Sequence, residues 1–250
     1  MSSDELLVKP RVYISAGSFH PQLTTSLRVD SKIGFGTELN LEDDFKLENE
    51  MNVFRISGIF RLSDRSQIVG SYTNINRSNT LTLNQSFDFK DTTFEAGARA
   101  KIDFDVFYYA LTYRYAVFDK PNWNAGLSGG LRYVKFKTGI DANFNSEFYS
   151  ATASIGAPAV LFGIHGSGYL TPKLLARYSL EYFWLSVSGI DIRILETNMT
   201  LSYFITKNIG IGAGYLNSNY RIKDIPLSDD FNGKVIFAFE GFNAFLNFRF

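Results

Sequence analysis

The sequence predicts an all-β fold, an up-and-down antiparallel transmembrane β-barrel of about ten strands, with eight or twelve as the alternatives. Three observations predict it. Apolar and polar residues alternate along many runs, which is the period of a strand with two unlike faces. The chain has 24 Phe, 14 Tyr and 20 Gly against 6 Pro, a composition that favours strands over helices. Finally, the last nine residues, FNAFLNFRF, form an alternating aromatic strand that ends the chain.

This last run separates a lipid face from a lumen face, because the outer surface of such a barrel is apolar and its interior polar. One face carries Phe242, Ala244, Leu246, Phe248 and Phe250, and the other carries Asn243, Asn247 and Arg249. A strand that ends on an aromatic residue resembles the C-terminal assembly signal of outer-membrane proteins. We therefore expect Phe242, Leu246, Phe248 and Phe250 to be read by the barrel-assembly machinery.

Polar breaks divide the chain into strands. We expect them at 11–31, 51–62, 67–89, 94–117, 123–144, 147–170, 174–188, 191–206, 209–223 and 233–250. Short turns at 63–66, 119–124, 171–173 and 206–208 alternate with longer polar segments at 32–50, 79–93, 140–147 and 223–232. Short periplasmic turns opposite longer outer loops are typical of these barrels. The prediction is one barrel domain over 11–250, preceded by a flexible extension at 1–10.

Composition argues against other classes. No stretch of ~18 uncharged apolar residues could form a transmembrane helix. The 25 basic residues balance the 25 acidic ones, so no nucleic-acid partner is expected. Without Cys there is no disulfide framework, thiolate metal site or Cys nucleophile. The start, MSSDELLVKP, lacks the features of a secretory signal, and we interpret it as the start of a mature chain whose precursor carries a cleaved signal.

Polar residues on the inward faces predict a polar lumen. A basic side chain on the lipid face at midplane costs ~2 to 4 kcal/mol, so charged residues within the strands should point inward. The candidates are Arg55, Arg61, His165, Ser167, Arg177, Glu181, Glu196 and Arg249. A ten-stranded barrel is only slightly wider than the eight-stranded size that side chains fill, so the lumen is expected to be narrow or occluded.

Two places do not fit a regular alternation. Lys101, Asp103 and Asp105 are out of phase with the inward candidates Ala110, Thr112 and Arg114 farther along the same run. The discrepancy requires either a charge at the lipid edge or a β-bulge near Val106, and we favour the bulge. His20 precedes Pro21 in the first strand, and we interpret it as a bulge or lumen residue.

Four blocks of sequence carry a resemblance to a family of small, functionally uncharacterised bacterial outer-membrane β-barrel proteins. They are GTELNLEDDFKL at 36–47, DFDVFYYALTYRY at 103–115, APAVLFGIHGSGYLTPK at 157–173 and NIGIGAGYLNSNY at 208–220. The resemblance spans about 11–250. It implies the barrel fold and an outer-membrane location in a Gram-negative bacterium, and it implies no particular activity or cofactor.

Two groups of residues are candidate chemical sites. Glu42, Asp43 and Asp44 make the first outer loop acidic, but they lack the spacing of a calcium loop and are weak metal candidates beside a solvated loop or contact with lipopolysaccharide. His165, Ser167 and Glu181 could form a hydrolase set of the lipid A deacylase kind. We favour an interior hydrogen-bond network for them, because they should lie near the periplasmic rim.

The functional prediction is a monomeric, non-enzymatic barrel with no cofactor, serving in passage of a small solute or in envelope structure. Its expected partners are outer-membrane lipid, lipopolysaccharide and, during biogenesis, the assembly machinery. One alternative is adhesion or ligand binding through the outer loops. Another is a hydrolase or an omptin-like protease, although no His is expected at the outer rim. A soluble lipocalin-like barrel is the fold alternative, and it would have an apolar interior.

Overall fold

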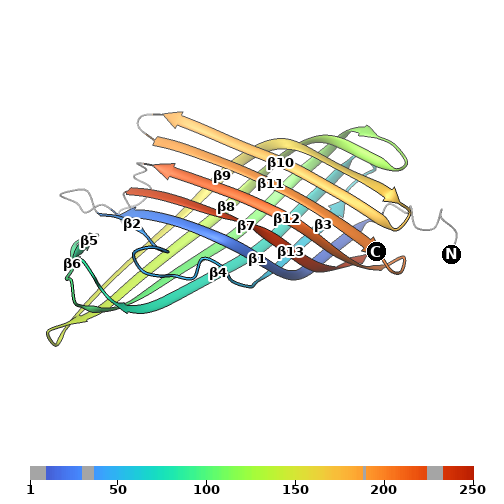
Figure 1. The fold of residues 1–250 in the computed structure, drawn as a ribbon. Helices are drawn as coiled ribbons and strands as arrows, with labels where there is room; N and C mark the ends of the chain where they lie inside the picture. The colour runs from blue at the N-terminus through green and yellow to red at the C-terminus, as the bar shows by residue number, and fades with distance from the viewer. Residues whose placement is uncertain (1–9, 30–36, 188–189, 224–232) are drawn as a thin grey trace.

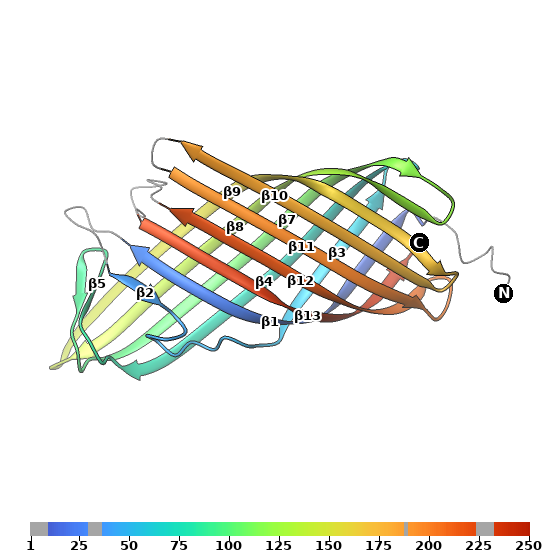
Figure 2. The ribbon, with the colours of Figure 1, turned by 45° about the horizontal axis from the view of Figure 1, so that its top comes forward.

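The computed structural model describes residues 10–29, 37–187, 190–223 and 233–250, and the expected extension at 1–10 lies almost wholly outside them. Ten antiparallel strands form the barrel: β1 (Val12–Val29), β3 (Val53–Arg61), β4 (Ser66–Thr82), β7 (Arg99–Asp119), β8 (Trp123–Phe144), β9 (Glu147–Thr171), β10 (Leu174–Val187), β11 (Ile190–Phe204), β12 (Ile209–Lys223) and β13 (Gly233–Arg249). Each strand pairs with the next, and β13 pairs with β1 to close the barrel (Figures 1 and 2). The predicted ten-stranded fold is confirmed. No helix in the described part of the chain is long and apolar enough to span a membrane.

Both ends of the described chain lie at the same end of the barrel as the four predicted short turns (Figure 1). The amide of Arg11 donates a 2.8 Å hydrogen bond to the carbonyl of Phe250, and the amide of Phe250 donates one of 3.0 Å to the carbonyl of Val12. With short turns and termini on the periplasmic side, the opposite end faces the medium.

A row of tyrosines marks the outer edge of the membrane-spanning band. Tyr72, Tyr109 and Tyr133 are directly paired on β4, β7 and β8, with ring centroids 5.0 and 6.4 Å apart. Below the row the outer face is apolar, with Leu111 and Leu131 more than half exposed. Such aromatic girdles form at membrane interfaces, where an apolar ring can carry a polar hydroxyl to the water side.

Beyond the tyrosine row the strands continue and their two faces exchange polarity. On β7 the outward residues become Asp105, Asp103 and Lys101, while inward residues become apolar. A strand needs only ~9 to 11 residues to cross the hydrocarbon, so much of the 25-residue β9 projects into the medium. There the outer face meets water, and the inside can pack as a dry core.

The apolar core of this outer extension is contributed by nearly every strand. Its largest fully buried side chains include Phe19, Phe104, Phe136, Phe237 and Ile75. Phe237 lies at its centre, with ring centroids 5.3 Å from Phe136 and 6.4 Å from Phe104. The expectation of a polar lumen is therefore wrong for this half of the barrel, because water rather than lipid surrounds it.

The predicted first outer loop forms part of the wall. Strand β3 is short, so above it the segment 37–52 lies between β1 and β4, beginning with the short strand β2 (Glu38–Asn40) paired with β1. The amide of Leu23 donates to the carbonyl of Asn49 at 2.7 Å, and the side-chain amide of Asn79 donates to the backbone carbonyl of Phe45 at 2.9 Å. The segment adds Leu41, Phe45 and Leu47 to the apolar core.

A small hairpin covers the outer end of that core. Strands β5 (Phe87–Phe89) and β6 (Thr92–Phe94) pair with each other outside the main sheet (Figure 1). Phe87 stacks on Phe94 with centroids 5.4 Å apart and meets Phe45 edge-on at 5.2 Å. The predicted third strand at 67–89 was therefore too long, since β4 ends at Thr82 and the chain turns into this cap.

The predicted bulge near Val106 is wrong. Strand β7 pairs with β4 and β8 without a register change from Arg99 to Ala116, and the only irregularity in its pairing lies between Ala116 and Phe118. Lys101, Asp103 and Asp105 are out of phase because they face water outside the barrel, above the tyrosine row. The strand is regular, and it is the surroundings that change along it.

Close approach of β9 and β10 makes one glycine a sensitive position. A Cβ on Gly163 would overlap the carbonyl oxygen of Leu180, whereas at Gly139 the nearest atom is 4.0 Å away, on Thr152. We expect Gly163→Ala to lower the free energy of unfolding by ~1 to 3 kcal/mol, the usual cost of overpacking. Gly139→Ala is the matched control, and urea titration of both variants in lipid vesicles is the measurement. Equal stabilities would contradict the close approach.

Candidate functional site

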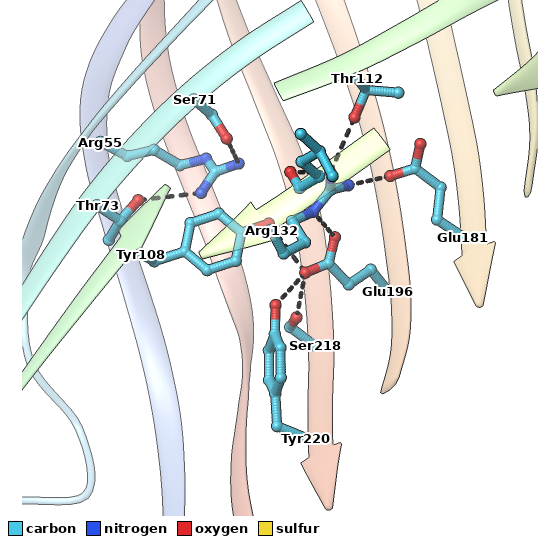
Figure 3. A network of polar contacts seen from close by, with 11 residues as sticks. Arg55, Ser71, Thr73, Tyr108, Thr112, Arg132, Glu181, Glu196, Ser218 and Tyr220 are labelled. Carbon is cyan, nitrogen blue, oxygen red and sulfur yellow. Dashed lines mark hydrogen bonds and ion pairs between the residues drawn. The ribbon is translucent and has the colours of Figure 1, made fainter. Parts of the chain in front are cut away.

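A network of buried polar side chains crosses the lumen level with the tyrosine row (Figure 3). Its centre is Arg132 on β8, which lies on the inner face between the outward residues Leu131 and Tyr133. Its Nε donates to Glu196 at 2.7 Å, its Nη2 donates to Glu181, and its Nη1 donates to Thr112 at 2.9 Å. One cation thus joins β7, β8, β10 and β11 across the barrel.

Glu196 accepts hydroxyl donors from Tyr108 on β7 and from two residues of the neighbouring strand β12. Tyr108 and Ser218 donate to its Oε1 at 2.9 and 3.1 Å, and Tyr220 donates to the same oxygen. The Glu196 residue is 6% exposed, so these bonds and that from Arg132 offset the cost of burying its charge. Together with the apolar core directly outward, the network closes the lumen.

Below the network lies a chamber of about 100 Å³ in the membrane-spanning half of the barrel. Its charged lining residues are Arg55, Arg114, Arg132, Arg177, Glu181 and Glu196. Arg55 donates to the hydroxyls of Thr73 and Ser71 at 3.0 and 3.4 Å (Figure 3). The guanidinium of Arg177 stacks on the Tyr13 ring at 4.2 Å. This is the polar lumen that the alternation predicted, confined to the inner half.

The eight predicted lumen residues all lie on strand positions whose alternation points inward. Glu181, Glu196, Arg55 and Arg177 line the chamber, while Arg61 lies at the periplasmic end. Arg249 lies near that end as well, stacking on Phe204 at 3.8 Å and donating to the Tyr169 hydroxyl at 2.7 Å. On the opposite face, Phe242, Leu246 and Phe250 of the predicted assembly signal are at least half exposed, as lipid-facing residues should be.

The suggested hydrolase set is not assembled. Ser167 donates to Asn124 at 3.1 Å, and Glu181 accepts from Arg132. His165 is buried, and its Nε2 has no hydrogen-bond partner among the described residues. A Ser nucleophile needs its base within hydrogen-bond reach, and here the Ser and the acid are each engaged elsewhere.

The acidic first loop is partly interior. Glu42 forms an ion pair with the buried Arg77 and accepts from the amide of Thr25 at 2.8 Å, while Asp44 accepts from the amide of Asn40 at 2.7 Å. These contacts anchor the segment 37–52 to the wall. Within the described ranges no three His, Asp or Glu residues are grouped as a metal site. The reading of Glu42 as part of a solvated loop is wrong, because it faces Arg77.

His20 lies on the outer face and not in the lumen. Strand β1 pairs with β13 without a bulge at this position, so the alternation continues through it. Its imidazole is 54% exposed, 3.9 Å from the carboxylate of Glu50. The prediction of a bulge or lumen role is wrong, because β1 remains regular past Pro21.

On the outer rim, Lys234 donates a 2.7 Å hydrogen bond to Glu38 and joins β2 to β13. This bond, with a second one from Ser26, holds the pKa of the Glu38 carboxyl below its usual value. Since the folded-state pKa is depressed, the contribution of this pair to stability is present at neutral pH and is lost as pH falls through that pKa. It is an exposed pair, and its contribution is accordingly small.

Several important residues were not singled out from the sequence. Arg132 and Arg77 are single cations within strand patterns, and Tyr108 and Tyr220 resemble the lipid-facing aromatics. Their positions in the strand alternation could have identified them, because each lies on the same face of its strand as the buried residues. Which of them meet across the lumen depends on the register of ten strands.

Comparison with known proteins supports the fold. No family model matches the sequence, and no curated protein is significantly similar to it. Among solved structures, the outer membrane protease OmpT from Escherichia coli is 12% identical over 96% of each chain, with a TM-score of 0.58. The translocator domain of the autotransporter NalP from Neisseria meningitidis is 12% identical over 97% of this chain and 90% of that one, with a TM-score of 0.52.

These two neighbours differ in their described roles, so the likeness speaks for the architecture alone. Three features of this chain agree with that architecture: the closed ten-stranded barrel, the outer apolar band with its aromatic girdle, and the placement of both ends of the described chain beside the short turns. The chain is a transmembrane β-barrel protein of the bacterial outer membrane.

Proposed function

We propose that this protein is a non-conducting, non-enzymatic barrel that acts by binding at its outer surface. The observation that carries the proposal is the continuous apolar core of the outer extension, which closes the lumen above the Arg132 network. A polar solute would have to displace buried aromatic side chains such as Phe104 and Phe237 to pass. The geometry therefore favours outer-surface binding, which was the alternative from the sequence, over the solute passage that the sequence analysis put first.

The outer extension is suited to presenting a surface. Its outward face carries charges of both signs, including Lys101 and Asp103, which form a 2.7 Å ion pair on β7. The hairpin of β8 and β9 projects farthest in Figure 1 and carries Phe148, which is 65% exposed. A dry core behind this face holds it rigid, which lowers the entropy cost of binding. We further propose that lipid and lipopolysaccharide surround a monomer.

Planar-bilayer conductance tests the sealed lumen. Refolded protein, shown to be inserted by heat-modifiable gel migration, is expected to give no conductance steps, because the core excludes water from the outer half. Steady steps from the full chain would contradict the proposal and support solute passage.

Genetic replacement in the source bacterium tests the surface role. A variant with residues 140–151 replaced by a two-residue turn should reproduce the phenotype of a deletion strain, whereas Arg55→Gln in the lumen should complement it. The opposite pattern would move the function into the lumen. Loss of complementation on His165→Ala or Ser167→Ala, in a folded protein, would support the hydrolase alternative.

A further inference from the structure

The lumen chamber carries an excess of positive charge. Its described lining has four guanidinium groups, from Arg55, Arg114, Arg132 and Arg177, and two carboxylates, from Glu181 and Glu196. Both carboxylates bind the same cation, Arg132. The lining therefore has a net excess of two positive charges, and among the described residues none of the other three guanidinium groups forms an ion pair with a carboxylate, at a depth where lipid surrounds the barrel. An uncompensated charge is costly there, so the chamber favours an anion.

The remaining guanidinium groups have donors to offer such an anion. The Nε of Arg114 is buried and has no hydrogen-bond partner in the described part of the chain. Arg114 is attracted by Glu181 and repelled by Arg132 and Arg177. Arg55 donates to two neutral hydroxyls and lies 6.0 Å from the centroid of the Tyr108 ring, and Arg177 stacks on the Tyr13 ring. Since a guanidinium has five N–H donors, all three can bind an oxyanion.

The chamber also has acceptors. Oε1 of Glu181 and Oδ1 of Asn243 are buried, and neither has a partner among the described residues. An oxyanion that retains an O–H group could donate to these oxygens while its other oxygens accept from the arginines. Phosphate has such a proton at neutral pH and sulfate has none. The combination of donors and acceptors therefore favours phosphate over sulfate.

Size and access agree with a small ion. The chamber of about 100 Å³ can hold a single tetrahedral ion but not a nucleotide. A second cavity of about 40 Å³ lies at the periplasmic end, is lined partly by Arg61, and shares Ile59 and Arg177 with the chamber. Outward, the Arg132 network and the apolar core close the lumen. An ion would therefore enter from the periplasm, past two arginines.

We propose that the chamber is a periplasm-facing binding site for one inorganic phosphate ion, held by Arg55, Arg114 and Arg177 and selected over sulfate by Glu181. The site is separate from the outer surface considered above, so either proposal can fail without the other. Bound phosphate would neutralise the excess charge and stabilise the barrel.

Isothermal titration of the full refolded chain in detergent with inorganic phosphate, and separately with sulfate, tests the proposal. The expected result is saturable binding of one phosphate per chain, with sulfate at least tenfold weaker. Arg114→Met should weaken phosphate binding at least tenfold, whereas the exposed outer-face variant Arg193→Met should leave it unchanged. Glu181→Gln should reduce the preference for phosphate over sulfate.

A stability measurement keeps the test independent of folding defects. Arg114→Met removes an uncompensated buried charge, so it should fold at least as well as the wild type without phosphate. Adding phosphate should raise the urea midpoint of the wild type and of Arg193→Met, but not that of Arg114→Met. Absence of saturable binding to the folded wild type, or equal binding by Arg114→Met, would overturn the proposal. Equal affinity for phosphate and sulfate would overturn the role of Glu181.

Discussion

Replacing Glu196 by Met is expected to destabilise the barrel by ~3 to 5 kcal/mol, the usual cost of removing one partner of a buried ion pair. The change leaves Arg132 with Glu181 as its one remaining carboxylate partner and adds a positive charge to the chamber excess. It also removes the acceptor of the Tyr108, Ser218 and Tyr220 hydroxyls. The free energy of unfolding, from urea titration in lipid vesicles, is the measurement.

The control lies on the same strand. Asp191→Asn breaks the 2.9 Å pair between Asp191 and Arg193 on the outer face, where the Arg193 side chain is 54% exposed. Exposed pairs contribute ~0 to 1 kcal/mol, so this change should cost little. Glu196→Gln keeps an oxygen acceptor for the hydroxyls and should be intermediate. A wild-type stability for Glu196→Met would mean that the network does not hold the strands together.

Replacing Phe237 by Ala is expected to cost ~3 to 5 kcal/mol, the range for removing a large aromatic side chain from a packed interior. Phe237 is fully buried in the outer extension, and its ring contacts Phe104, Phe136 and Phe239 at centroid distances of 5.3 to 6.4 Å. The cavity would lie above the Arg132 network, inside the apolar core that closes the outer half of the lumen.

Phe148→Ala is the matched control, since Phe148 belongs to the same outer extension but is 65% exposed. Surface changes usually alter stability by less than ~0.5 kcal/mol. Urea titration compares the free energies of unfolding of the two variants. Binding of a polarity-sensitive dye to Phe237→Ala reports whether the apolar core has opened. If both variants lost equally little stability, the outer half would be a hydrated lumen and the sealed-barrel proposal would fail.

The sequence alone determined the fold class, because the alternation of apolar and polar residues is visible within each strand, without knowledge of the strands that pair with it. The inner turns and the faces of β3, β10 and β13 follow directly from it. The predicted inward residues, Arg55 and Glu196 among them, follow from the same parity. The strand ends were predicted less well. Strand β4 ends seven residues before the predicted strand did, because the alternation of apolar and polar residues continues past Thr82 into the cap.

The tertiary structure decided what each face meets. Alternation says that two faces differ, but not where the surroundings change from lipid to water. Lys101, Asp103 and Asp105 suggested a bulge because the lumen was assumed to be polar throughout, whereas above the tyrosine row the polar face is the outer one. The apolar interior expected of a soluble barrel is present in that half, and the polar lumen of a membrane barrel in the other.

Long-range pairing decided the site. Arg132 lies 64 positions before Glu196 and 49 before Glu181, and only the register of the closed sheet brings them together. The folding of 37–52 into the wall likewise depends on β3 being too short to separate β1 from β4. Local pattern determined which side chains face inward, but barrel closure determined which of them meet, because partners across a lumen belong to strands distant in sequence.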